Sequence, residues 1–141
     1  MKRKSTGEKM RRSVLGDAHV DAAKARTTPF SKPFQELVNR YPWGEIWTRP
    51  GLSRSERSLV VLSVLAALGH DEELAMHVVA ARRNGLTLVQ IQEVLLQVAV
   101  YAGVPAGNRA FRVAERALGD ENPRATGAKT VRPRARKSSK S

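Results

Sequence analysis

The sequence contains no cysteine among its 141 residues. This absence excludes disulfide bonds, a catalytic thiolate, cysteine-based zinc sites and thiol peroxidase chemistry. It also fits a reducing compartment, so we expect a cytoplasmic protein. Aromatic residues make up only 5% of the chain. A hydrophobic core therefore has to be built from leucine, valine, isoleucine and alanine.

Long apolar runs are also missing. The longest one, residues 59–68, contains Ser63 and is too short to cross a bilayer. No apolar segment follows the positive charges at the N-terminus, so a signal peptide is not supported. We therefore expect a protein without a membrane partner.

The net charge of +12 is concentrated at the two ends. Residues 1–12 carry +5 and residues 124–141 carry +7, so the region between them is neutral. Residues 120–141 contain few large apolar side chains, which predicts a disordered basic tail there. Residues 1–12 are interpreted as a flexible basic tail. These tails flank one predicted domain, residues 13–119. Two roles are possible for such tails: they increase solubility, or they bind nucleic acid non-specifically.

Hydrophobic residues in the central region recur at helical intervals, and no segment shows the sustained alternation of a strand. We therefore expect an all-α domain of roughly six helices joined by short loops. The clearest helical stretches are residues 34–41, 53–68, 71–83, 87–101 and 105–118.

Capping residues and helix breakers mark the helix boundaries. Residues 53–56 and 87–90 match the capping box, in which Ser or Thr precedes Glu or Gln by three positions. Pro42 and Gly44 predict a break after the first stretch. Residues 59–68 are apolar on nearly every face, so this helix has to be covered all round. We expect contacts between copies of the chain to contribute to that cover.

His77 is the strongest catalytic candidate among three histidines. On a helix, Glu73 lies four residues before it on the same face, among apolar or small residues. A carboxylate there can fix the tautomer of the imidazole and raise its pKa. The alternatives are a surface contact between the two side chains, or a core histidine. A metal site is not expected, because one histidine and one glutamate do not form a ligand set.

Residues 43–51 contain both tryptophans, Trp43 and Trp47, beside Glu45 and Arg49. Loops with large aromatic side chains beside charges are common ligand-binding sites. The alternative is an anchored loop with packed aromatic rings. Arg57 lies in the first turn of the apolar helix, where it either binds a carboxylate through its bidentate fork or pairs structurally.

These features together resemble the carboxymuconolactone decarboxylase family, within the AhpD-like superfamily of all-helical oligomers. The resemblance covers about residues 10–118, and its most specific part is WGEIWTRPG at residues 43–51. The superfamily-level motifs are RSL at residues 57–59, ELAMHVVAA at 73–81, NG at 84–85 and EVLLQ at 93–97. Thiol peroxidase members carry two cysteines where this chain has His70 and Glu73, which excludes their activity here.

The resemblance implies a cofactor-free decarboxylase acting on a lactone dicarboxylate. The implied reaction converts 4-carboxymuconolactone to the enol-lactone of 3-oxoadipate plus CO2, in the protocatechuate branch of aromatic catabolism. Electrons left by the departing carboxylate delocalise onto the lactone carbonyl, so neither cofactor nor metal is needed. The resemblance also implies a homo-oligomer, either a trimer or a hexamer.

Roles for individual residues follow from this resemblance. His77, oriented by Glu73, is expected to deliver a proton to carbon. The other expected roles are carboxylate binding by Arg49 and Arg57, orientation of an arginine or crowding of the leaving carboxylate by Glu45, and exclusion of water by Trp43 and Trp47. Two alternatives stay open: a related carboxy-lyase or lactone-modifying enzyme, and a non-catalytic nucleic-acid-binding protein with basic tails.

Overall fold

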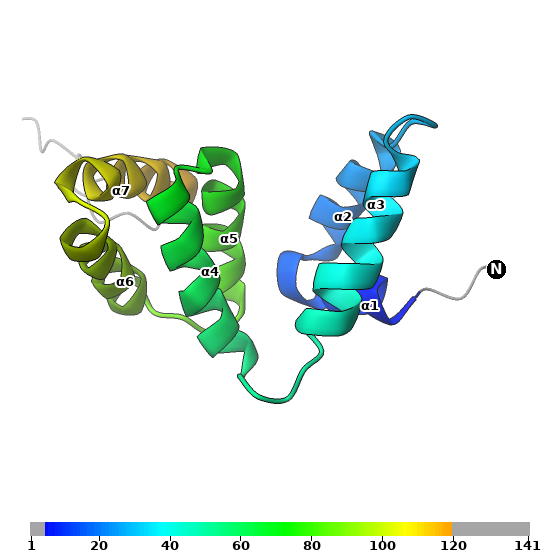
Figure 1. Ribbon diagram of the computed structural model, residues 1–141, viewed down its shortest axis with the longest axis horizontal. Helices are drawn as coiled ribbons and strands as arrows, with labels where there is room; N and C mark the ends of the chain where they lie inside the picture. Colours follow the sequence, from blue (N-terminus) through cyan, green and yellow to red (C-terminus); the bar gives the residue numbers. More distant parts are fainter. Residues whose placement is uncertain (1–4, 120–141) are drawn as a thin grey trace, which may run out of the picture.

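The computed structural model describes residues 5–119, so the predicted C-terminal tail lies outside the described residues. Within that range the chain is all-helical, as predicted, with seven α-helices and one π-helix (Figure 1). The elements are α1 (Thr6–Leu15), α2 (Asp17–Ala25), α3 (Lys32–Val38), η1 (Asn39–Ile46), α4 (Arg54–Leu68), α5 (Asp71–Arg83), α6 (Leu88–Tyr101) and α7 (Val104–Leu118).

Two groups of helices make up the described chain. Figure 1 shows α4 to α7 together on one side and α1 to α3 on the other, joined by the loop before α4. The larger hydrophobic core lies among α4 to α7 and includes Leu62, Val78 and Leu95. A smaller core joins α1, α2 and η1 to Ala80 of α5. Helix α5 is therefore shared by both cores.

Helix α1 begins inside the segment predicted to be a flexible tail. The Ser5 hydroxyl caps it by accepting a hydrogen bond from the Glu8 N–H at 3.2 Å. The prediction of a flexible tail over residues 1–12 is wrong from Ser5 onward, because basic side chains of this run have partners in the fold. Arg12 forms ion pairs with Glu8 at 3.1 Å, Asp17 at 3.1 Å and Asp21 at 2.7 Å.

The predicted break at Pro42 and Gly44 is also wrong. Helix α3 continues directly into η1, and the Trp47 N–H donates to the Pro42 carbonyl at 2.9 Å, five residues earlier. A π-helix is a wider turn that occurs often at functional sites, and here it accommodates a proline that cannot donate a hydrogen bond. Gly7 of α1 packs so closely on η1 that an added Cβ would lie 1.6 Å from the Asn39 carbonyl oxygen.

The predicted boundaries of the later helices are confirmed. Both capping boxes form, with Ser53 and Glu56 at the start of α4 and Thr87 and Gln90 at the start of α6. Helix α5 ends at Arg83, as predicted, and α7 begins at residue 104, one position before the predicted start.

Helix α4 is only partly covered within one chain. Leu62 and Ala66 are buried, whereas Val60, Val64 and Leu68 are 50%, 48% and 65% exposed. The three exposed residues are spaced by four, so they form one apolar stripe along the helix. Complete burial of α4, which the sequence led us to expect, is therefore not reached inside a single chain. No helix within residues 5–119 is both long and apolar enough to span a membrane.

Candidate active site

His77 is stacked in a group of three aromatic rings where the two helix groups meet. Its side chain lies in the middle of α5 and is 8% exposed. Its ring centroid is 6.3 Å from those of both Trp43 and Trp47, with interplanar angles of 11° and 15°. The two indoles stack at 4.9 Å. The π-helix therefore brings Trp43 and Trp47, the tryptophans predicted to belong to the site, into contact with His77.

Burial keeps the His77 imidazole uncharged at neutral pH. Removal from water is the main cause that lowers its pKa to about 4, and the nearby His19 acts in the same direction. Glu73 acts in the opposite direction and is outweighed. The raised pKa expected from the sequence is therefore wrong. Glu73 itself is exposed, so its charge is screened by water, and no hydrogen bond joins it to His77 within the described residues.

His19 on α2 belongs to the surroundings of this site, although spacing gave no reason to select it. Burial is the largest cause that lowers its pKa, and the charges of Arg11 and Arg26 lower it further. Its neighbour Val20 packs in the same small core as Trp43. The only signal in the sequence was that His19 lies within the stretch covered by the family resemblance.

The two predicted carboxylate-binding arginines are connected through the backbone. Arg57 Nη2 donates to the Arg49 carbonyl at 2.9 Å, which holds the start of α4 against the loop that follows Trp47. Arg57 Nε is buried and has no hydrogen-bond partner within the described chain. The Arg49 side chain is exposed. Arg57 therefore retains a donor that a bound anion would satisfy.

Ser58 presents a second unpaired polar atom beside Arg57. Its side chain is 2% exposed, and its hydroxyl oxygen has no partner in the part of the chain described. The same region holds the contact between Ser55 and the Asn84 carbonyl at 2.9 Å, which ties the start of α4 to the end of α5. Sequence reasoning missed Ser58 as a functional candidate, because a lone serine in an apolar helix carries no distinctive pattern.

Glu45 lies on the exposed side of η1. Its carboxylate is 3.6 Å from Arg40 Nη1, and its side chain is 54% exposed. The arginine that it contacts is therefore neither Arg49 nor Arg57.

Comparison with known proteins agrees with the resemblance seen in the sequence. The profile of the carboxymuconolactone decarboxylase family matches residues 32–116. The chain is 43% identical over 114 residues to 4-carboxymuconolactone decarboxylase of Acinetobacter baylyi, covering 81% of this chain and 85% of that protein. It is 40% identical over 114 residues to nitrosuccinic acid decarboxylase of Metarhizium robertsii, covering 81% and 80% of the two chains.

A shorter match supports the same assignment. Over 43 residues the chain is 42% identical to 4-carboxymuconolactone decarboxylase of Pseudomonas putida, covering 30% of this chain and 90% of that sequence. The family profile includes every residue selected for the site from the sequence, since all of them lie between Trp43 and His77. The family predicted from the sequence is confirmed, and this chain belongs to the carboxymuconolactone decarboxylase family.

Proposed function

We propose that this protein decarboxylates 4-carboxymuconolactone to 3-oxoadipate enol-lactone without an added cofactor. The observation that carries the proposal is the buried, neutral His77 imidazole stacked on Trp43 and Trp47. The proposal is also supported by 43% identity over 114 residues to 4-carboxymuconolactone decarboxylase of Acinetobacter baylyi. The neutral charge of residues 13–123 gives no support to a nucleic-acid-binding domain. We expect the enzyme to act in the cytoplasm.

The reaction needs one proton and a place for negative charge. The C–C bond to the ring carboxylate breaks, CO2 leaves, and the electron pair delocalises through the ring double bond onto the carbonyl oxygen of the lactone. A proton is then added to carbon. Hydrogen-bond donors held in a water-poor site stabilise such an oxyanion. Trp43 and Trp47 exclude water around His77 and so strengthen these interactions.

His77 is proposed to gain its proton when substrate binds. In the free protein, burial keeps the imidazole neutral. The negative charge of a bound dicarboxylate favours the imidazolium form and so opposes the effect of burial. His77 then donates this proton to the ring carbon next to the lactone carbonyl, which leaves the double bond of the enol-lactone at the carbon that lost CO2. Glu73, which raises the pKa of His77 from an exposed position, assists this protonation without touching the ring.

Substrate carboxylates are assigned to the start of α4. Arg57 has a buried Nε without a partner, and the adjacent Ser58 hydroxyl is also unpaired within the described residues. Arg49 is fixed by its backbone contact with Arg57 and supplies a second, exposed guanidinium. Glu45 is assigned the orientation of an arginine, Arg40, whose Nη1 lies 3.6 Å from its carboxylate.

We also propose that the active form is a homo-oligomer, a trimer or a hexamer. The support is the apolar stripe of α4, Val60, Val64 and Leu68, which one chain leaves uncovered. Light scattering coupled to size exclusion measures the assembly directly. Val64→Lys should shift it toward smaller species, whereas Glu72→Lys, an exposed change outside the stripe, should not.

The test of function is an absorbance assay on 4-carboxymuconolactone. We expect turnover by the wild type and a loss of about 10²-fold or more in kcat for His77→Ala. His70→Ala serves as the matched control, because His70 is exposed at the start of α5. An inactive wild type would refute the proposed substrate. A fully active His77→Ala variant would refute the proposed role of His77 and leave the substrate proposal intact.

A second substrate should be assayed in parallel, because a relative of 40% identity is a nitrosuccinic acid decarboxylase. In nitrosuccinic acid a nitro group replaces the lactone carbonyl as the acceptor of the electron pair, so the same proton donor would serve both reactions. CO2 release from each acid, compared as kcat/KM, identifies the substrate. We expect the lactone to be preferred.

A further inference from the structure

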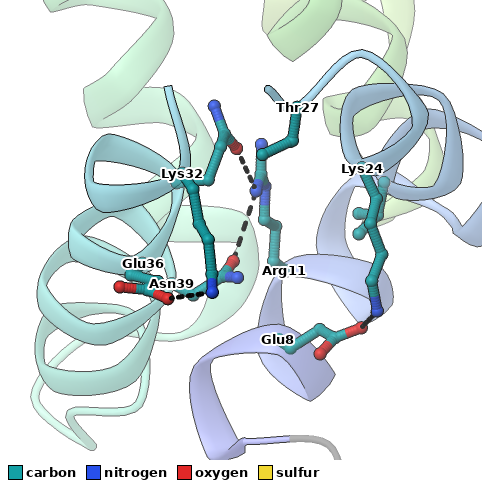
Figure 2. Close-up of a pocket in the computed structure, with 9 residues that line it drawn as sticks. Glu8, Arg11, Lys24, Thr27, Lys32, Glu36 and Asn39 are labelled. Atoms are coloured by element: carbon teal, nitrogen blue, oxygen red, sulfur yellow. Dashed lines mark hydrogen bonds and ion pairs between the residues drawn. The ribbon is translucent and has the colours of Figure 1, made fainter. Parts of the chain in front are cut away.

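A cavity that none of the three stacked rings lines lies among α1, α2, α3 and the start of η1 (Figure 2). Its volume is about 300 Å³, within the range of small-molecule sites. No residue assigned above to decarboxylation lines it, and Val20 is the one lining residue that also packs in the core with Trp43. The remaining lining residues are Glu8, Arg11, Lys24, Thr27, Lys32, Gln35, Glu36 and Asn39.

Arg11 is the unusual member of this lining. Its side chain is 9% exposed, and Nη1 donates to Gln35 Oε1 at 3.1 Å and to Asn39 Oδ1 at 3.2 Å. Both partners are neutral amides. Nε is buried without a partner, and no carboxylate of the described chain lies within ion-pair distance of this guanidinium. Buried arginines are rare unless they are paired with a negative charge.

The other charges of the cavity compensate one another. Lys24 Nζ is 3.7 Å from Glu8 Oε1, and Lys32 Nζ is 3.7 Å from Glu36 Oε1. Glu8 also contacts Arg12, which lies outside the lining and is paired with Asp17 and Asp21 as well. Figure 2 shows Arg11 between these two pairs, with Lys32 and Asn39 on one side and Lys24 and Glu8 on the other. The lining therefore carries one uncompensated positive charge, and this charge is on Arg11.

One negative charge on a planar group is the best match for this arrangement. A carboxylate can pair with the guanidinium through the unused Nε and a terminal nitrogen. A phosphate dianion would hold both of its charges on one tetrahedral group between Glu8 and Glu36, whereas a dicarboxylic acid such as succinate places only one of its charges beside Arg11. We propose that this cavity binds a small organic acid, with Arg11 as the counter-charge of its carboxylate. The cavity is lined by none of the residues assigned above to decarboxylation, and it can be tested by binding alone.

The experiment is calorimetric and thermal titration of the full chain with sodium succinate, sodium acetate and inorganic phosphate at constant ionic strength. Saturating succinate should raise Tm by about 3 °C or more. Arg11→Met, which keeps the length of the side chain and removes its charge, should abolish this rise. Circular dichroism establishes whether that variant folds.

Two surface variants test the charge argument without touching the core. Lys32 and Glu36 are both exposed, and each is the other's ion-pair partner. Lys32→Gln should weaken succinate binding about two- to threefold, and Glu36→Gln should strengthen it by a similar factor. Arg26→Gln makes the same charge change as Lys32→Gln outside the cavity lining and should leave the affinity unchanged.

Three results would refute the proposed organic-acid site at Arg11. The first is no heat and no rise in Tm when the wild type is titrated with either carboxylate. The second is tighter binding of phosphate than of succinate at equal ionic strength. The third is a change of affinity in the same direction for Lys32→Gln and Glu36→Gln.

Discussion

Acid should destabilise the protein through His77. The folded protein holds the pKa of this group at about 4, against an ordinary value of 6.5. Between these values the unfolded chain binds a proton that the folded protein excludes, so the free energy of unfolding falls as pH falls through this range. At about 1.4 kcal/mol per pH unit, the full interval corresponds to roughly 3 kcal/mol. About 2 kcal/mol of this should be lost between pH 7 and pH 5.

This loss is large compared with the total stability of a small domain, about 5–15 kcal/mol. Urea unfolding, followed by circular dichroism at a fixed protein concentration, measures it at each pH. His77→Phe retains a ring against Trp43 and Trp47 but has no group to titrate, so its stability should fall about 2 kcal/mol less between pH 7 and pH 5. The matched control, His70→Gln, should follow the wild type, since His70 is exposed.

Equal pH dependence in the wild type and His77→Phe would refute the reasoning. It would mean that His77 is hydrated or paired in the folded protein, and that Glu73 on α5 offsets the lowering of its pKa by burial and by His19. An NMR titration of the His77 ring carbons gives the same pKa by an independent route.

Three further predictions concern substrate binding and packing. Binding of an unreactive dicarboxylate analogue at pH 7 should take up close to one proton through His77, which calorimetry in buffers of different ionisation enthalpy measures. Arg57→Lys should raise KM about tenfold with a smaller change in kcat, because lysine lacks the bidentate fork; steady-state kinetics decides this. Gly7→Ala should destabilise the protein by about 1–3 kcal/mol in urea unfolding, because its Cβ would overlap the Asn39 carbonyl. Gly51→Ala, with open space around its Cβ, is the control and should stay near wild-type stability.

Helix boundaries set by local hydrogen bonds were predictable from the sequence. In each capping box the partners are three residues apart, so the pattern itself contains the whole interaction. The π-helix was not predictable in this way. Pro42 argues for a break when it is considered alone, and the close approach of Gly7, 35 positions earlier, is visible only in the fold.

The same distinction explains the candidate site. The spacing of Glu73 and His77 correctly placed them one turn apart, but it could not show that one is exposed and the other buried. That difference depends on Trp43 and Trp47, which reach His77 from another element. The count of basic residues near the N-terminus likewise gave no sign that Arg11 is buried and Arg12 paired.

Because α5 is shared by two cores, His77 and the rings that cover it belong to different packing units. Helices α4 to α7 carry His77, whereas η1 and α1 supply the rings and packing that shield it. The smaller unit has fewer buried apolar residues and should open first under mild denaturation. Partial opening would return His77 to water while most of the helical structure persists. Loss of activity should therefore precede loss of helicity, and hydrogen exchange should be faster in α1 and η1 than in α5.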